Sequence, residues 1–294
     1  MRSKSAPISA LVKFSLFFLL AFSAEAVEVA IMPTFDAQLL PGADFPLGDG
    51  SETLTIDGGT APFTTYPIED ILAEFPLDQI PMGAIISSAQ LMLDSTTPSF
   101  QMTVIEVLGY EGDGLASLSD EDINTTLIGM SDPVDSSSDI NIDLNSTFIE
   151  SLLGSASHVG LRLSSSAEDT ELTIIASESI TGVPPKLLLE YSLLAGDMNG
   201  DGVVDEEDAA LFVQALTDRA AYDMAFPLIN ADIVGNVNLD GQFDFGDLVS
   251  FNGLYASGFA SASAVPEPGV LAMMAWGWLG LCLRSKRRRG CDRA

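Results

Sequence analysis

Short runs of alternating apolar and polar residues dominate residues 27–194. Runs rich in Ile, Val, Leu and Thr alternate with Gly, Ser, Asp and Pro, which is typical of a two-sheet β-sandwich. The predicted strands are residues 53–57, 71–76, 85–94, 100–108, 140–145, 157–164, 171–177 and 186–193. Three sets of alternate residues should face the core: Ala89, Leu91 and Leu93; Val159, Leu161 and Leu163; and Leu187, Leu189 and Tyr191. A short helical turn is predicted at residues 148–153.

The pattern changes after residue 195. Two segments rich in Asp, Asn and Gly, residues 197–208 and 236–247, each precede apolar residues at helical spacing. The first is followed by Leu211, Phe212, Val213 and Leu216, and the second by Leu248, Val249, Phe251 and Leu254. The chain is therefore predicted to be mainly β, with a small α-helical module of two loop–helix units at residues 195–257.

Both segments have the ligand spacing of a twelve-residue calcium loop, which supplies oxygens from positions 1, 3, 5, 7, 9 and 12 around a glycine at position 6. The first loop offers Asp197, Asn199, Asp201, the Val203 carbonyl, Asp205 and Asp208, with Gly202 at the turn. The second offers Asn236, Asn238, Asp240, the Gln242 carbonyl, Asp244 and Asp247, with Gly241 at the turn. Two Ca²⁺ sites are predicted, the second weaker because an amide replaces its first carboxylate. The alternative is a pair of acidic turns in an acidic chain.

Position 12 is Asp in both loops, and no clear amphipathic helix precedes either of them. A loop and following helix in two copies resembles the type I dockerin module, over residues 196–257. The segments LTDRAAYDMAF (216–226) and DFGD (244–247) are similar to dockerin repeats of secreted planctomycete proteins. The resemblance implies calcium-dependent folding and a cohesin-like β domain as partner. The alternative is a module that stabilises its own chain.

Four phrases of the β region also resemble a family, the DNRLRE-type β-sandwich, which is related to carbohydrate-binding modules. They are AEFPLDQIPMGAIISSAQLML (73–93), DINIDLNSTFIESLL (139–153), SHVGLRLSSS (157–166) and PPKLLLEYS (184–192). This resemblance implies an extracellular polysaccharide as a candidate ligand. Aromatic rings that could stack on a sugar are Phe63, Tyr66 and Tyr110, which fall in or next to predicted turns. Such rings are more often local loop anchors.

Both termini carry predicted hydrophobic helices. Residues 1–26 are typical of a secretory signal peptide, with Arg2 and Lys4 before an apolar run and a cleavage site at Ala24 and Ala26. An uncleaved anchor is the alternative.

At the other end, a small-residue linker (258–264) precedes Pro266, Glu267 and Pro268, an apolar run and a basic cluster. Residues 265–289 resemble the PEP-CTERM sorting signal, followed by a cytoplasmic tail at 290–294. This implies export to the cell envelope or surface of a Gram-negative-type bacterium, a transient membrane anchor, and an exosortase-type processing enzyme. A plain membrane anchor is the alternative.

The net charge and the positions of the cysteines exclude several classes of partner and site. The formal net charge is −30, and Arg162, Lys186 and Arg219 are the basic residues between positions 27 and 264. Such a body repels a phosphate backbone, so nucleic acid is excluded as a partner. Both cysteines, Cys282 and Cys291, lie in the C-terminal tail, so the body has no disulfide, no thiol nucleophile and no Cys/His zinc site.

No catalytic constellation is recognisable in the sequence. His158 is the single histidine, and no orienting partner for it is apparent, which favours a surface residue over a general base. The sequence therefore predicts an exported, non-catalytic, calcium-binding envelope or extracellular-matrix protein, with a β-sandwich that is a candidate for binding polysaccharide and a dockerin for docking to another protein. Two alternatives stay open: a polysaccharide-degrading enzyme that carries a dockerin, and a purely structural envelope protein.

Overall fold

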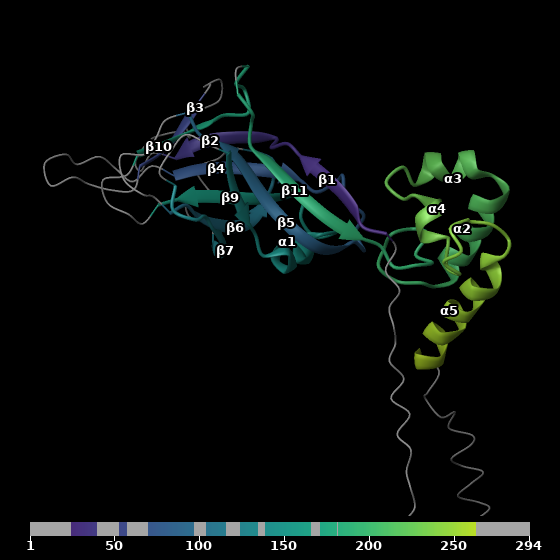
Figure 1. The fold of residues 1–294 in the computed structure, drawn as a ribbon. Helices are drawn as coiled ribbons and strands as arrows, with labels where there is room; N and C mark the ends of the chain where they lie inside the picture. Colours follow the sequence, from purple (N-terminus) through teal and green to yellow (C-terminus); the bar gives the residue numbers. More distant parts are fainter. Residues whose placement is uncertain are drawn as a thin grey trace, which may run out of the picture.

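The computed structural model describes residues 25–39, 53–57, 70–96, 104–115, 124–134, 139–165, 171–180 and 182–262. A body of antiparallel strands is followed along the chain by a helical module, and the two lie side by side (Figure 1). The described chain is thus mainly β, with antiparallel sheets and few helices, as predicted.

The described strands form three antiparallel sheets, one more than the predicted two-sheet sandwich, and together they are called the β domain below. One sheet has the order β1(Val27–Ile31)–β11(Lys186–Ser192)–β5(Ile85–Asp94)–β8(Asp139–Asp143). A five-stranded sheet has the order β2(Phe35–Leu39)–β4(Asp70–Pro76)–β9(His158–Ser164)–β6(Glu106–Gly112)–β7(Thr126–Met130). A two-stranded sheet pairs β10(Glu171–Ile175) with β3(Thr53–Asp57).

Alternation along the strands builds the core. The three residue sets predicted to face inward, on β5, β9 and β11, are all buried. They belong to one hydrophobic cluster to which both larger sheets contribute. The predicted helical turn is α1(Ser146–Leu152), which starts after Asn145, whose side chain accepts a hydrogen bond from the Thr147 N–H at 3.1 Å.

Three described strands, β1, β2 and β7, were not predicted. Strand β6 runs from Glu106 to Gly112 and so extends past the predicted end at residue 108, and residues 100–103 of that prediction lie outside the described residues. The β6 sequence EVLGYEG contains two glycines, and its pairing with β7 shifts register between Val107 and Leu108. Glycine and a register shift both break the strict alternation on which the prediction depends.

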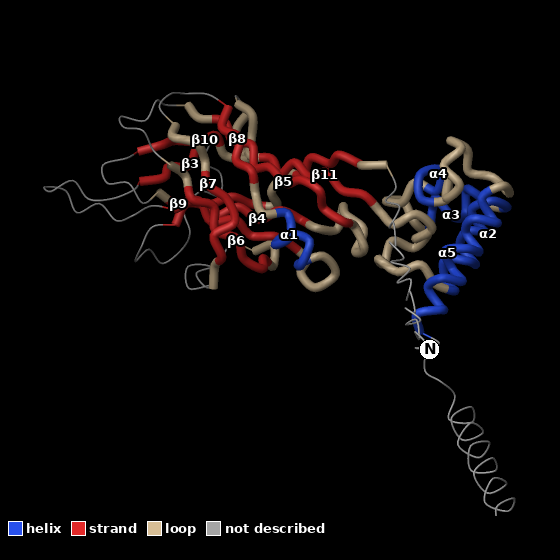
Figure 2. Tube along the Cα trace, turned by 60° about the horizontal axis from the view of Figure 1, so that its bottom comes forward, coloured by secondary structure: helices blue, strands red, loops and turns tan. Residues whose placement is uncertain are grey.

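The helices after the β domain are α2(Glu206–Thr217), α3(Arg219–Ala225), α4(Ala231–Val234) and α5(Asp247–Ala262). Figure 2 shows these four grouped at one end of the molecule. Helix α5 runs past residue 257 into the range predicted as a linker. Its last residues, ASGFASA, are rich in alanine, a strong helix former, and the first proline after them is Pro266.

The described residues contain no helix with both the length and the apolar character needed to cross a membrane. Ala26 is exposed just before β1. The other predicted processing residues, Ala24 and Pro266–Glu267–Pro268, lie outside the described residues, as do both predicted terminal helices.

Candidate metal centre

The first loop, residues 197–208, is organised around the carboxylate at its last position. Asp208 is fully buried and accepts backbone N–H groups from Met198 at 2.7 Å, Asn199 at 3.1 Å and Asp205 at 2.8 Å. The side chain of Asp205 in turn accepts the N–H of Glu207 at 2.8 Å, so Asp205 and Asp208 form a capping box for helix α2. One residue pair thus closes the loop and starts the helix.

The second loop, residues 236–247, repeats this arrangement. Asp247 is also fully buried, and it accepts the backbone N–H groups of Asn238 at 3.0 Å and Asp244 at 2.9 Å. The Asp244 side chain accepts the N–H of Gly246 at 2.6 Å. Each of these three bonds has a counterpart at the same position of the first loop, which supports the predicted duplication; the bond from position 2, made by the Met198 N–H, belongs to the first loop.

Positions 3, 5 and 7 also correspond. In the first loop Asn199 Oδ1 accepts the Asp201 N–H at 3.0 Å, Asn199 Nδ2 donates to the Asp201 carboxylate at 2.9 Å, and that carboxylate accepts the Val203 N–H at 2.9 Å. In the second loop Asn238, Asp240 and Gln242 make the same three bonds at 2.9, 3.0 and 2.9 Å.

Both loops turn sharply at positions 4 and 6. Gly202 and Gly241, at position 6, have φ angles of 91° and 89°. Position 4 is also left-handed, with Gly200 at 69° and Leu239 at 61°. A left-handed leucine is strained, because its Cβ crowds the backbone, whereas glycine adopts this conformation at no steric cost. The glycines at position 6 thus occupy the sharp turn that the sequence assigned to them.

The two loops differ at position 1. The Asp197 carboxylate is buried and accepts N–H groups from Gly200 at 2.8 Å, Asp201 at 3.2 Å and Gly202 at 2.9 Å. At the equivalent place in the second loop, Asn236 Oδ1 is buried and has no hydrogen-bond partner. A buried, unpartnered oxygen is costly in a protein interior and is expected where an ion is to be bound.

Burial also acts on the protonation of the first loop. Desolvation raises the pKa of Asp197 to about 6, against the hydrogen bond from Gly202, and the nearby Asp208 carboxylate raises it further. Desolvation likewise raises the pKa of Asp208, opposed by the N–H groups of Asp205, Asn199 and Met198. Burial and the neighbouring carboxylates thus outweigh the loop's own N–H groups, so the charged forms of Asp197 and Asp208 are disfavoured.

The residues present fit a calcium ion in their chemistry, since every side-chain donor at the predicted positions is a carboxylate or amide oxygen. In the described part of the chain no three His, Cys, Asp or Glu side chains are grouped closely enough to hold a metal. In both loops the carboxylates are engaged by backbone N–H groups instead. Binding would therefore draw the position 1, 3 and 5 oxygens together around the ion.

An aromatic cluster connects the two loop–helix units. Phe212 of α2 lies 5.1 Å from Phe243 of the second loop and 4.4 Å from Phe251 of α5, measured between ring centroids. A hydroxyl connects α3 to the first loop, since Tyr222 Oη donates to the Met198 carbonyl at 2.7 Å. The second loop is thus packed against α2 of the first unit, and the first loop is hydrogen-bonded to α3.

His158 has partners that the sequence did not reveal. Thr34 Oγ1 lies 2.9 Å from its Nε2, and Ser157 Oγ lies 2.9 Å from its Nδ1. His158 and both hydroxyl residues line a groove of about 650 Å³, with Asp78 and Met82. Thr34 is 124 residues away in the chain, so local sequence carried no signal for this contact.

Tyr110 is only 1% exposed, which contradicts its selection as an exposed sugar-stacking ring. The neighbouring strand explains the burial: Gly160 of β9 faces Tyr110 of β6, and a side chain at position 160 would meet the tyrosine ring at 2.2 Å. The absence of a side chain at Gly160 thus leaves room for the Tyr110 ring. Phe63 and Tyr66 lie outside the described residues.

No family model and no curated protein matches the chain. Among solved structures, a Clostridium thermocellum endo-1,4-β-D-xylanase 10B, comprising CBM22-1 and GH10 modules complexed with xylohexaose, is similar at a TM-score of 0.23 and 6% identity. The match covers 56% of this chain and 30% of that chain. At this TM-score the likeness carries no argument about function.

Proposed function

We propose that residues 195–257 form a dockerin-like module that binds two calcium ions. Asp197, Asn199, Asp201, the Val203 carbonyl, Asp205 and Asp208 would hold the first ion. Asn236, Asn238, Asp240, the Gln242 carbonyl, Asp244 and Asp247 would hold the second, more weakly. The observation that carries the proposal is the matching hydrogen-bond network of the two loops, together with the unpartnered Asn236 oxygen.

Bound calcium would supply positive charge to buried carboxylates and turn binding energy into folding energy. Residues of both loops and of the following helices already hold the sites near their folded arrangement. Asp208 and Asp247 fix the entry and exit of each loop through backbone N–H groups, and the aromatic cluster holds the following helices together. Removing the ion would leave crowded carboxylates that repel one another and loosen both helices.

We further propose that the whole protein is an exported, non-catalytic component of the cell envelope or extracellular matrix. An extracellular polysaccharide is the candidate ligand of its β domain, and its module would dock a cohesin-like domain. The N-terminal signal and the C-terminal sorting sequence support export and exosortase-type processing. A glycan array with the full chain tests the sugar claim, and an absence of binding to acidic and neutral polysaccharides would remove it.

The calcium claim is tested by circular dichroism of the full chain in calcium and after chelation. Helical signal should rise with calcium in the wild type and should not rise when Asp197 and Asp240 are both replaced by alanine. A control that replaces Asp78 and Asp132, two exposed carboxylates of the β domain, removes the same charge and should behave as wild type. An unchanged helical signal after complete chelation of the wild type would refute the proposal.

A further inference from the structure

The first calcium loop lies against the β domain. The N–H of Gly83, in the turn before β5, donates to the Gly200 carbonyl at 2.7 Å. Gly83 is also so close to the loop backbone that a Cβ on it would fall 1.9 Å from the Gly202 nitrogen. On the other side of the same turn, a Cβ on Gly200 would lie 3.1 Å from Pro81. Positions 4 to 6 of the loop are therefore a contact surface between the two parts of the molecule.

The peptide groups that touch the β domain are held by the first calcium ligand. Asp197 accepts the N–H groups of Gly200, Asp201 and Gly202, and these are the residues that lie on the Pro81–Gly83 turn. An ion that took over the Asp197 oxygens would change how these three peptides are held. Any such change reaches the β domain directly, because no side chain separates the two backbones.

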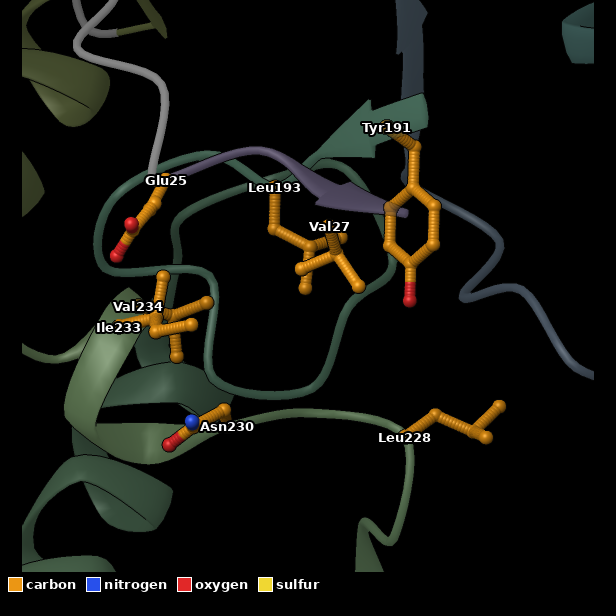
Figure 3. A pocket seen from close by; sticks show the side chains of 8 residues that line it. All are labelled: Glu25, Val27, Tyr191, Leu193, Leu228, Asn230, Ile233 and Val234. Carbon is orange, nitrogen blue, oxygen red and sulfur yellow. The ribbon is translucent and has the colours of Figure 1, made fainter. Parts of the chain in front are cut away.

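The rest of the junction is less tightly filled. Figure 3 shows Val27, Tyr191 and Leu193 of the β domain facing Ile233 and Val234 of the helical module across a hollow. The hollow measures about 200 Å³ and is bordered by Leu228 and Asn230. One backbone hydrogen bond, from the Gly196 N–H to the Val234 carbonyl at 2.7 Å, fixes the connection to α4. Apolar walls around a void resist tilting less than close-packed backbones do.

Among the described residues, the second loop has no such neighbour. Leu239, at the position equivalent to Gly200, is 60% exposed, and a Cβ on Gly241 would meet nothing within 4 Å. Two loops whose hydrogen bonds correspond at positions 3, 5, 7, 9 and 12 are therefore in different surroundings. One packs against the β domain at positions 4 to 6, and the other faces solvent at the equivalent positions.

We propose that calcium in the first loop locks the helical module onto the β domain, while calcium in the second loop leaves this junction unchanged. The inference rests on the proposed calcium binding and assigns the two sites different roles. Because coupling is reciprocal, a contact that the bound ion strengthens must itself strengthen binding of the ion. Gly83, which belongs to the β domain and offers calcium no ligand, then contributes to the affinity of the first site.

Calcium titration of the full chain tests this coupling. Gly83→Ala places a methyl group where the Gly202 backbone lies, and should lower the calcium affinity of the first loop by about 5- to 150-fold, the usual range of coupling between sites. The second loop should keep its affinity. The matched control is Gly253→Ala, on α5, where an added methyl meets nothing within 4 Å; its two affinities should equal those of the wild type.

A distance measurement gives an independent readout. Fluorophores on Ser88→Cys in β5 and Val249→Cys in α5, both exposed, report the separation of the two parts once Cys282 and Cys291 are replaced by serine. The distance distribution should be narrow in calcium and broad in chelator. In calcium it should stay broad for Asp201→Asn in the first loop and stay narrow for Asp240→Asn in the second, which occupies the equivalent position.

The outcomes separate this inference from the proposed function. If the wild type takes up no calcium, the proposed function fails. If both loops load but Gly83→Ala keeps wild-type affinity, or the distance distribution is the same in calcium and chelator, the lock is refuted while calcium binding stands. If circular dichroism shows that Gly83→Ala has lost its β structure, this variant does not test the lock. The distance measurement on Asp201→Asn and Asp240→Asn then decides.

Discussion

Position 1 is where the two proposed calcium loops differ most in chemistry. Asp197 brings a carboxylate with three N–H partners, whereas Asn236 brings an amide whose oxygen is buried and unpartnered. An amide oxygen can bind calcium but adds no charge, and affinity in such loops follows the number of charged ligands. The replacement of a carboxylate by an amide at position 1 thus accounts for the weaker second site that we propose.

Replacing Asn236 by aspartate should raise the calcium affinity of the second loop by about tenfold or more, equivalent to roughly 1.4 kcal/mol. Calorimetric titration of the full chain measures this. Asn230→Asp is the matched control, because it adds the same charge at the start of α4, outside both loops. An equal gain in both variants would mean that general charge attracts the ion and that position 1 does not bind it.

Asp36 gives the β domain a pH dependence. It is 1% exposed on β2, and desolvation raises its pKa to about 6, against hydrogen bonds from the Ser177 N–H at 2.7 Å and Oγ at 3.0 Å. Because the folded pKa lies above the unfolded value of 3.8, the stabilising contribution is complete below that value and is lost as the pH rises through 6.

Urea unfolding of the wild type and of Asp36→Asn measures this contribution, in saturating calcium and from about pH 3.5 to about pH 7. This range spans the unfolded and folded pKa values of Asp36. The wild type should lose up to about 3 kcal/mol relative to the asparagine variant over this range. A difference between the two proteins that does not change with pH would show that Asp36 does not titrate there.

At the scale of elements, the features that could be predicted are those encoded within a short stretch of sequence. Ligand spacing in the two loops is complete within twelve residues, so loop positions and the helices after them followed from the sequence. Strands with clean alternation, such as β5 and β9, were likewise predictable. Strands whose alternation is broken by glycine or by a register shift, such as β6, were not, because their burial depends on neighbours far away in the chain.

The Phe212–Phe243–Phe251 cluster should decide whether the two loop–helix units hold together. Phe212→Ala should lower the free energy of unfolding of the calcium-loaded helical module by about 3–5 kcal/mol, the usual cost of removing a buried phenylalanine. Thermal unfolding followed by the helical signal measures the loss. Val249→Ala, on the exposed side of α5, should change it by less than about 0.5 kcal/mol; comparable losses in both variants would contradict the assigned role of the cluster.

At the scale of the molecule, the sequence divides into a β region and a helical module, but the structure packs them against each other. Their buried residues form one continuous cluster, with Ile80 and Leu193 from the first part and Met198 and Ile229 from the second. The close approach of Gly83 to Gly202 could not be predicted, since it joins residues far apart in sequence through backbone atoms alone. The contact between the Thr34 and His158 side chains, 124 residues apart in the chain, could not be predicted either.

The most direct test of calcium binding is calorimetric titration of the decalcified full chain. We predict two saturable binding events, with the stronger one lost in Asp201→Ala and the weaker one lost in Asp240→Ala. A titration without saturable uptake, or one in which both variants retain both events, would contradict the account.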